Sequence, residues 1–97
     1  MAKKHDSGFE LFRALGDRTR YNITSALLDG EKCACELPGL VKRAQPTVSL
    51  QLKCLEKAGI VESRRDGKKR LYRISSRLAR EMLEGAGKRS HGATTPD

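Results

Sequence analysis

The chain has 97 residues, carries a formal net charge of +8, and a third of its residues are charged. This length fits one small domain with a thin core, for which support from a second copy is a common solution. No apolar run approaches the roughly 20 residues of a membrane span, and the charged start lacks the apolar stretch of a secretory signal. We therefore expect a cytoplasmic protein whose thiols stay reduced, not a membrane protein.

Two short helices are predicted at the start of the chain. The first covers residues 8–15, GFELFRAL, in which apolar side chains recur near one face. Asp17 is positioned to cap a second helix over residues 18–28, which ends at the Asp29-Gly30 pair.

A short helix and a longer helix follow, joined by a tight turn. The short helix is expected over residues 36–42, with Pro38 tolerated in its first turn. The longer helix covers residues 47–59, where Val48, Leu52 and Leu55 repeat at helical spacing and define a core face. Its other side is polar and carries no acid before Glu56.

A β-hairpin is predicted next, from two strand-like segments around the turn DGKK at residues 66–69. A last helix is expected over about residues 77–83. The segment from residue 85 to residue 97 is rich in Gly, Ser and Thr, which is typical of a flexible tail. We therefore predict one domain over residues 1–84 and a flexible C-terminal tail over residues 85–97.

Positive charge is concentrated in the second half of this arrangement. Between Lys42 and Arg73, ten basic residues stand against three acidic ones. A polar helix beside a basic hairpin predicts a mainly α winged helix-turn-helix that binds duplex DNA. The predicted DNA contacts are Gln45, Thr47, Ser49, Leu50, Gln51 and Lys53 on the helix, and Arg64, Arg65, Lys68, Lys69 and Arg70 on the hairpin.

Three segments together resemble the ArsR/SmtB family of metal-sensing repressors. They are LFRALGDRTRYNITSALL, CACEL and QPTVSLQLKCLEKAGIVESRRDGKKRLYRIS, which lie between about Phe9 and Ser75. Arg18 stands where the family often has proline. The resemblance implies a homodimer paired through its first and last helices, which binds a palindromic operator and releases it when an inducer binds.

Apolar residues outside the helix-turn-helix fit that expected dimer. Phe9 and Phe12 in the first helix, with Leu78 and Met82 in the last, exceed what one thin core needs. The alternative is that these four side chains pack within the protomer.

Cys33 and Cys35 are the first candidate metal ligands. Thiolates bind soft ions such as As(III), Cd(II), Pb(II) and Zn(II). Because Pro38 delays the helix, we expect an extended segment that presents both sulfurs to one side. The resemblance implies As(III) as the favoured inducer and no permanent cofactor, although Pro38 stands where the arsenic-sensing branch usually has its third cysteine.

A third ligand has several candidate sources. Cys54 matches a cysteine of some cadmium and lead sensors of the family, but it also fits a small, half-buried apolar residue. The N-terminal His5 and Asp6 of the partner chain are another source, because related cadmium sensors use such an arm. Cys54 could also join a site that is built with the partner chain.

Other functions remain open from the sequence. The protein could instead respond to Cd(II), Pb(II), Zn(II) or cysteine oxidation; a disulfide between Cys33 and Cys35 would be strained, so oxidation should link chains or involve Cys54. It could also be a winged-helix module without a metal inducer, docking RNA or protein, although few stacking aromatics favour RNA. No catalytic signature stands out, so we expect no enzyme.

Overall fold

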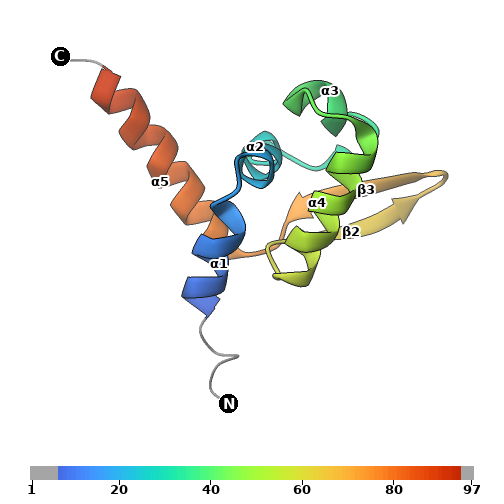
Figure 1. Cartoon of the computed structure of the whole chain (residues 1–97), viewed down its shortest axis with the longest axis horizontal. Coiled ribbons are helices and arrows are strands. Elements are labelled where there is room, and N and C mark those ends of the chain that lie inside the picture. The colour runs from blue at the N-terminus through green and yellow to red at the C-terminus, as the bar shows by residue number, and fades with distance from the viewer. Residues whose placement is uncertain (1–6, 95–97) are drawn as a thin grey trace.

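The computed structural model describes residues 7–94, which form a mainly helical fold with a small sheet (Figure 1). This confirms the predicted winged helix-turn-helix. The helices are α1 (Ser7–Leu15), α2 (Arg18–Ala26), α3 (Leu37–Val41), α4 (Gln45–Lys57) and α5 (Arg77–Thr94). The strands are β1 (Lys32–Cys33), β2 (Val61–Asp66) and β3 (Lys69–Ile74).

Local sequence signals account for the helix ends. The Asp17 carboxylate accepts a hydrogen bond of 3.1 Å from the backbone N–H of Arg20, so it caps α2 as predicted. Pro38 lies in the first turn of α3, where no intrahelical donor is lost. Lys42 ends α3 in the left-handed conformation, with a φ of 55°.

The hairpin of β2 and β3 forms the wing, which here means residues 61–74. The two strands pair antiparallel from Val61 opposite Ile74 to Asp66 opposite Lys69, and Gly67 takes a positive φ in the turn. A third strand, β1, pairs with the other edge of β3, giving the order β1-β3-β2. The sequence does not predict β1, because two residues are too few to show a strand period.

The core lies where α2, α3, α4 and the sheet meet. Val48, Leu52 and Leu55 are all buried, which confirms the predicted core face of α4. The wing begins directly from this core, since Ile60 and Val61 are also buried. The other fully buried large side chains are Ile23, Leu27 and Leu37, with the polar Thr24.

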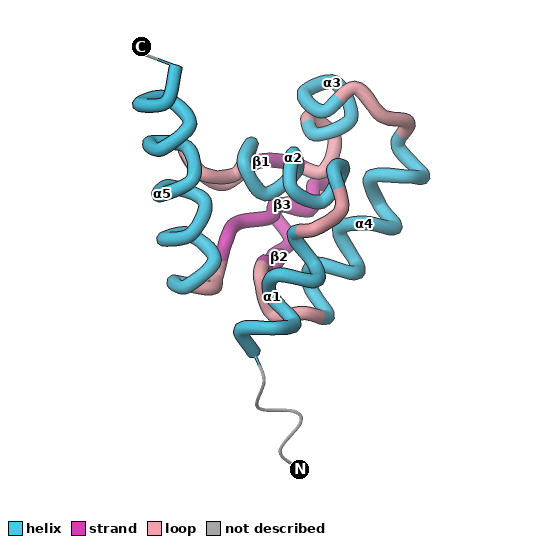
Figure 2. The backbone as a smooth tube through the Cα atoms, turned by 60° about the vertical axis from the view of Figure 1, so that its left-hand side comes forward, coloured by secondary structure: helices cyan, strands magenta, loops and turns pink. Residues whose placement is uncertain are grey.

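Helices α1 and α5 lie at the end of the molecule opposite the tip of the wing (Figure 1). In the view of Figure 2, α4 and α5 lie on opposite sides of the strands. Leu11 and Ala14 of α1 and Ala79 and Leu83 of α5 anchor the two helices to the core.

The last helix is longer than predicted. It continues to Thr94, although its glycines each cost a helix interior roughly 1 kcal/mol. Adding a residue to an existing helix is far easier than starting one, so weak residues can still be helical. The division into residues 1–84 and a flexible tail over 85–97 remains a prediction. Over residues 7–94, no helix combines the length and apolar character that crossing a membrane requires.

Candidate nucleic-acid interface and thiol site

One side of α4 is fully open to solvent. The exposed face of α4, by which we mean Gln45, Thr47, Ser49, Leu50 and Lys53, lies opposite the buried core face. Leu50 is its most apolar member and is 59% exposed. The face contains no acidic side chain, so nothing on it would repel a phosphate backbone.

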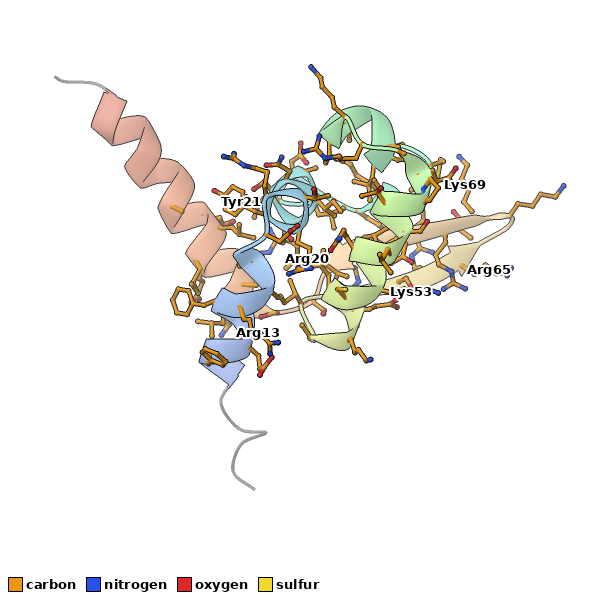
Figure 3. All side chains as sticks on the ribbon, in the orientation of Figure 1. Arg13, Arg20, Tyr21, Lys53, Arg65 and Lys69 are labelled. Carbon is orange, nitrogen blue, oxygen red and sulfur yellow. A yellow bond between two sulfur atoms is a disulfide. The ribbon has the colours of Figure 1, made fainter. Side chains whose placement is uncertain are left out.

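Gln51 differs from the other predicted helix contacts. It is half-buried, and its Oε1 accepts a hydrogen bond of 2.7 Å from Nη1 of Arg20. Nε of Arg20 donates a second bond of 2.7 Å to the carbonyl of Ala14. Arg20 lies between α1 and α4 (Figure 3). Sequence reasoning missed it, because a contact between residues 31 positions apart leaves no local signal.

The five predicted wing residues are all exposed, but they differ in their partners. Arg65, Lys68 and Lys69 form no ion pair with another residue of the described segment 7–94, so their charges are available to a ligand. In the view of Figure 3, Lys53 of α4 and Arg65 of the wing both lie in the half of the molecule that holds the wing. Arg70 donates from Nη1 to the hydroxyl of Ser63, at 3.0 Å.

Arg64 is already paired. Its Nε and Nη2 donate to the two carboxylate oxygens of Glu31 at 2.9 and 3.0 Å. The hydrogen bond from Arg64 is the main reason that the pKa of Glu31 lies below its ordinary value. The same pair raises the pKa of Arg64. A DNA phosphate would therefore have to compete with Glu31 for this guanidinium.

Cys33 and Cys35 come together, but not through an extended segment. Cys33 ends β1 and is 3% exposed, whereas Cys35 is exposed in the turn that follows. That turn is closed by a hydrogen bond of 2.9 Å from the backbone N–H of Glu36 to the carbonyl of Cys33. The two sulfurs form a disulfide in this structure. The sequence led us to expect that oxidation would link chains or involve Cys54, whereas in this structure the turn brings the sulfurs of Cys33 and Cys35 together.

The thiol segment is bonded to the wing. Lys32 and Cys33 pair with Tyr72 and Leu71 of β3. Just beyond the strand, the backbone N–H of Ala34 donates to the carbonyl of Arg70 at 2.9 Å. The disulfide therefore lies beside β3, the central strand of the sheet. Ala34, the residue between the two cysteines, is bonded to the backbone of the wing residue Arg70.

Cys54 is an exposed free thiol, so the prediction of a half-buried apolar residue is wrong. It lines a cavity of about 350 Å³ together with residues of α1, α2 and α4. The other lining residues are Glu10, Arg13, Ala14, Arg20, Lys57 and Ala58.

A complete metal site is not assembled within the described protomer. No group of three or more His, Cys, Asp or Glu side chains is arranged to hold an ion there. The candidate ligands His5 and Asp6 lie outside the described residues. Cys33 and Cys35, once reduced, supply two soft donors.

Three large apolar side chains of α1 and α5 are exposed. Phe9 is 57%, Phe12 is 64% and Leu78 is 47% exposed, while Met82 is half-buried against the core. Packing within the protomer therefore does not cover the three exposed side chains.

Comparisons with known proteins place this architecture in a family. Residues 17–63 match the family described as bacterial regulatory protein, arsR family. An uncharacterised HTH-type transcriptional regulator of Methanocaldococcus jannaschii is 36% identical, over 84% of this chain and 93% of its own. A probable mercury resistance operon repressor of Streptomyces lividans is 41% identical, over 80% and 62% respectively. An arsenic resistance transcriptional regulator of Pseudomonas putida is 33% identical, over 90% and 71%.

Solved structures agree with the sequence relatives. Reduced HlyU of Vibrio cholerae superimposes with a TM-score of 0.83 and 27% identity, over 89% of this chain and 90% of that one. A homodimeric winged helix-turn-helix DNA-binding domain from Mycobacterium bovis gives a TM-score of 0.81 and 24% identity, over 93% and 83%. The chain belongs to the ArsR family of winged helix-turn-helix transcriptional regulators.

Proposed function

We propose that this ArsR-family repressor acts in the cytoplasm, binds a palindromic operator as a homodimer, and leaves it when As(III) binds the reduced thiols of Cys33 and Cys35. One observation carries the proposal. The thiol pair lies on β1 and the turn after it, in the same small sheet as the wing that bears the available cations. Chemistry at the sulfurs and contact with DNA can therefore influence each other over a short path.

The DNA surface combines the exposed face of α4 with the wing. A recognition helix in the major groove can present Gln45, Thr47, Ser49, Leu50 and Lys53 to base edges and nearby phosphates. The available cations Arg65, Lys68 and Lys69 suit the phosphate backbone, and Arg70 and Arg64 can join them. For Gln51, the bond from Arg20 supports a positioning role rather than a direct base contact.

Dimerisation through α1 and α5 would cover the exposed apolar residues. Phe9, Phe12 and Leu78 are exposed on these two helices, which lie at the end of the molecule opposite the tip of the wing. The Mycobacterium bovis domain of similar fold is described as homodimeric. A twofold dimer would place two recognition helices about one DNA turn apart, ~34 Å.

The inducer is a soft ion because the donors are thiols. Relatives of this chain are named for mercury and arsenic resistance, which is the same class of thiophilic ligand. Binding requires the reduced, deprotonated sulfurs, so it releases protons and weakens as the pH falls well below a free thiol pKa of ~8.5. A third donor would come from Cys54, from the N-terminal His5 and Asp6, or from the partner chain.

The route from the sulfurs to DNA would run through the sheet as well as through α3. Gathering both sulfurs onto one ion changes the turn after β1, whose Ala34 N–H is bonded to Arg70 of the wing. It also strains the start of α3, which leads into the turn before α4. A coupling free energy of ~1–3 kcal/mol would lower operator affinity about five- to 150-fold.

The test compares ion binding with operator release. Under reducing conditions, mass spectrometry should detect one As(III) bound to each protomer, and fluorescence anisotropy should detect loss of operator binding. Cys33→Ser and Cys35→Ser should fold and bind the operator but no longer respond. Cd(II) and Zn(II) serve as competing ions. If the double variant still left the operator on addition of As(III) as readily as the parent, the proposal would be wrong.

A further inference from the structure

Leu50 occupies an unusual place for a leucine. It is 59% exposed in the middle of α4, while Val48 and Leu52, two positions away on either side, are each 1% exposed. Its helical neighbours Pro46 and Lys53 are also exposed. Leu50 therefore makes no contribution to the core of the protomer, although it is a large apolar side chain.

The surroundings of Leu50 are otherwise suited to polar contacts. Ser49 and Thr47 carry hydroxyl groups and Lys53 carries a charge, so each can bond to a base edge or phosphate. A leucine can do neither. On the major-groove edges of B-DNA, the one apolar group is the C5-methyl of thymine. An apolar side chain at this position thus has one favourable partner among the four bases.

The neighbouring residue Gln51 is not placed to recognise a base beside Leu50. Its carbonyl oxygen is held by Arg20, and the side chain is half-buried on the flank of α4. A glutamine needs both its oxygen and its nitrogen to recognise adenine in the bidentate manner. Gln51 is therefore not free to recognise adenine in this manner beside Leu50.

We propose that Leu50 is a specificity-determining residue that packs against the 5-methyl group of one thymine in each operator half-site. This inference rests on the proposed DNA-binding function and adds the chemical feature that the helix reads. The contact removes the exposed leucine and the methyl group from water together, which is the physical source of the preference. A 5-methylcytosine at the same step would satisfy Leu50 equally, because the methyl group occupies the same place.

The proposal differs from the simple view that Leu50 is an ordinary exposed leucine. Isolated apolar residues are common on protein surfaces and need no partner. Leu40 on α3 offers the matched control, because it is a leucine of similar exposure, 53%, outside the exposed face of α4. The two residues can be truncated in the same way and compared.

The experiment removes methyl groups one at a time. A half-site is first obtained by selecting the wild-type protein on random duplex DNA, and each thymine is then replaced by deoxyuridine. Wild-type affinity should fall roughly three- to fivefold at one thymine in each half-site, the effect of about one buried methyl group. Leu50→Ala should bind the parent site more weakly and should be indifferent to deoxyuridine at that position. Leu40→Ala should behave as the wild type.

Two results would overturn the inference. One is that deoxyuridine reduces wild-type affinity at no position, and the other is that Leu50→Ala retains the full sensitivity to the missing methyl group. Either result refutes the thymine contact and leaves the repressor function intact. Failure of the wild-type protein to enrich any sequence would instead refute the proposed function itself. Alanine is the best helix former, so truncation at this exposed site should leave α4 folded, which circular dichroism would verify.

Discussion

Nη1 of Arg20 donates a 2.7 Å hydrogen bond to Oε1 of Gln51, joining the start of α2 to the middle of α4. The same guanidinium donates from Nε to the carbonyl of Ala14 near the end of α1. Because a guanidinium can only donate, the Gln51 amide must turn its oxygen toward Arg20. A helix of the proposed dimer surface is thus tied to the recognition helix through one arginine.

Removing Arg20 should destabilise the protein and affect DNA binding indirectly. Arg20→Ala leaves the Ala14 carbonyl and Gln51 without their donor, so we expect the free energy of unfolding to fall by ~1–3 kcal/mol. Urea denaturation followed by circular dichroism measures this change. Arg18→Ala, which alters an arginine two positions earlier, should have little effect. Equal stability of the two variants would show that the bonds of Arg20 contribute nothing.

The Gln51→Ala variant separates positioning from base reading. Direct base contact by Gln51 would relax discrimination at one base pair by ~1–3 kcal/mol. With its oxygen held by Arg20, we expect instead a similar loss of affinity for every operator variant, because α4 is less well fixed. Competition binding against a set of single-base operator variants distinguishes the two patterns. If discrimination were lost at one base pair only, Gln51 would be shown to contact that base directly.

The wing lysines should contribute affinity without specificity. Replacing Lys68 and Lys69 with alanine should weaken binding to all DNA alike and lower the salt slope by roughly 0.9 for each phosphate that the variant no longer neutralises. Binding measured over a range of salt concentrations gives the slope. The matched control replaces Arg13 and Arg77, two exposed cations of α1 and α5, which removes the same charge away from the wing. An unchanged slope in the wing variant would exclude phosphate binding by these lysines.

The pair of Glu31 and Arg64 should make stability depend on acidic pH. Folding lowers the pKa of Glu31 below its ordinary 4.5, chiefly through the bond from Arg64. The stabilisation is therefore fully present above the unfolded pKa, and it is lost as the pH falls through the lower folded value. As the pH is lowered below 4.5, the free energy of unfolding measured in urea should fall less for Glu31→Gln than for the wild type.

A second carboxylate near the thiol segment provides the comparison for Glu31. The pKa of Asp29 is also lowered, chiefly through its hydrogen bond with Lys32. Asp29 therefore also stabilises the folded protein less as the pH falls. Asp29→Asn should remove the contribution of Asp29 to the pH dependence of stability and leave the pair of Glu31 and Arg64 intact. A Glu31→Gln profile that matches the wild type at every pH would contradict a role for the pair in stability.

The exposed apolar side chains of α1 and α5 should control assembly. Phe12→Glu combined with Leu78→Glu places charges on the proposed dimer surface, so we expect monomers in sedimentation measurements. Leu40→Glu and Leu50→Glu together add the same charge at similarly exposed leucines elsewhere, and this variant should remain a dimer. A dimer that survives the first pair of changes would require another interface.

Local patterns in the sequence determined most of the helices and the hairpin of this protein. The cap at Asp17, the core face of α4 and the paired strands of the wing all follow from residues within a few positions of one another. Such features depend on helix and strand periods and on turn chemistry, which a single sequence displays directly. The thiol pair and the basic hairpin were each predictable as chemical types for the same reason, whereas their placement side by side was not.

Tertiary structure decided which of the predicted site residues are available to a ligand and which are already bonded to other side chains. Gln51 is held by Arg20 across 31 positions and Arg64 by Glu31 across 33, while β1 exists because β3 pairs with it. The exposure of Cys54 and the turn that joins Cys33 to Cys35 likewise depend on how the elements pack. The energy of each long-range contact comes from groups that are distant in the chain, so no local period encodes it.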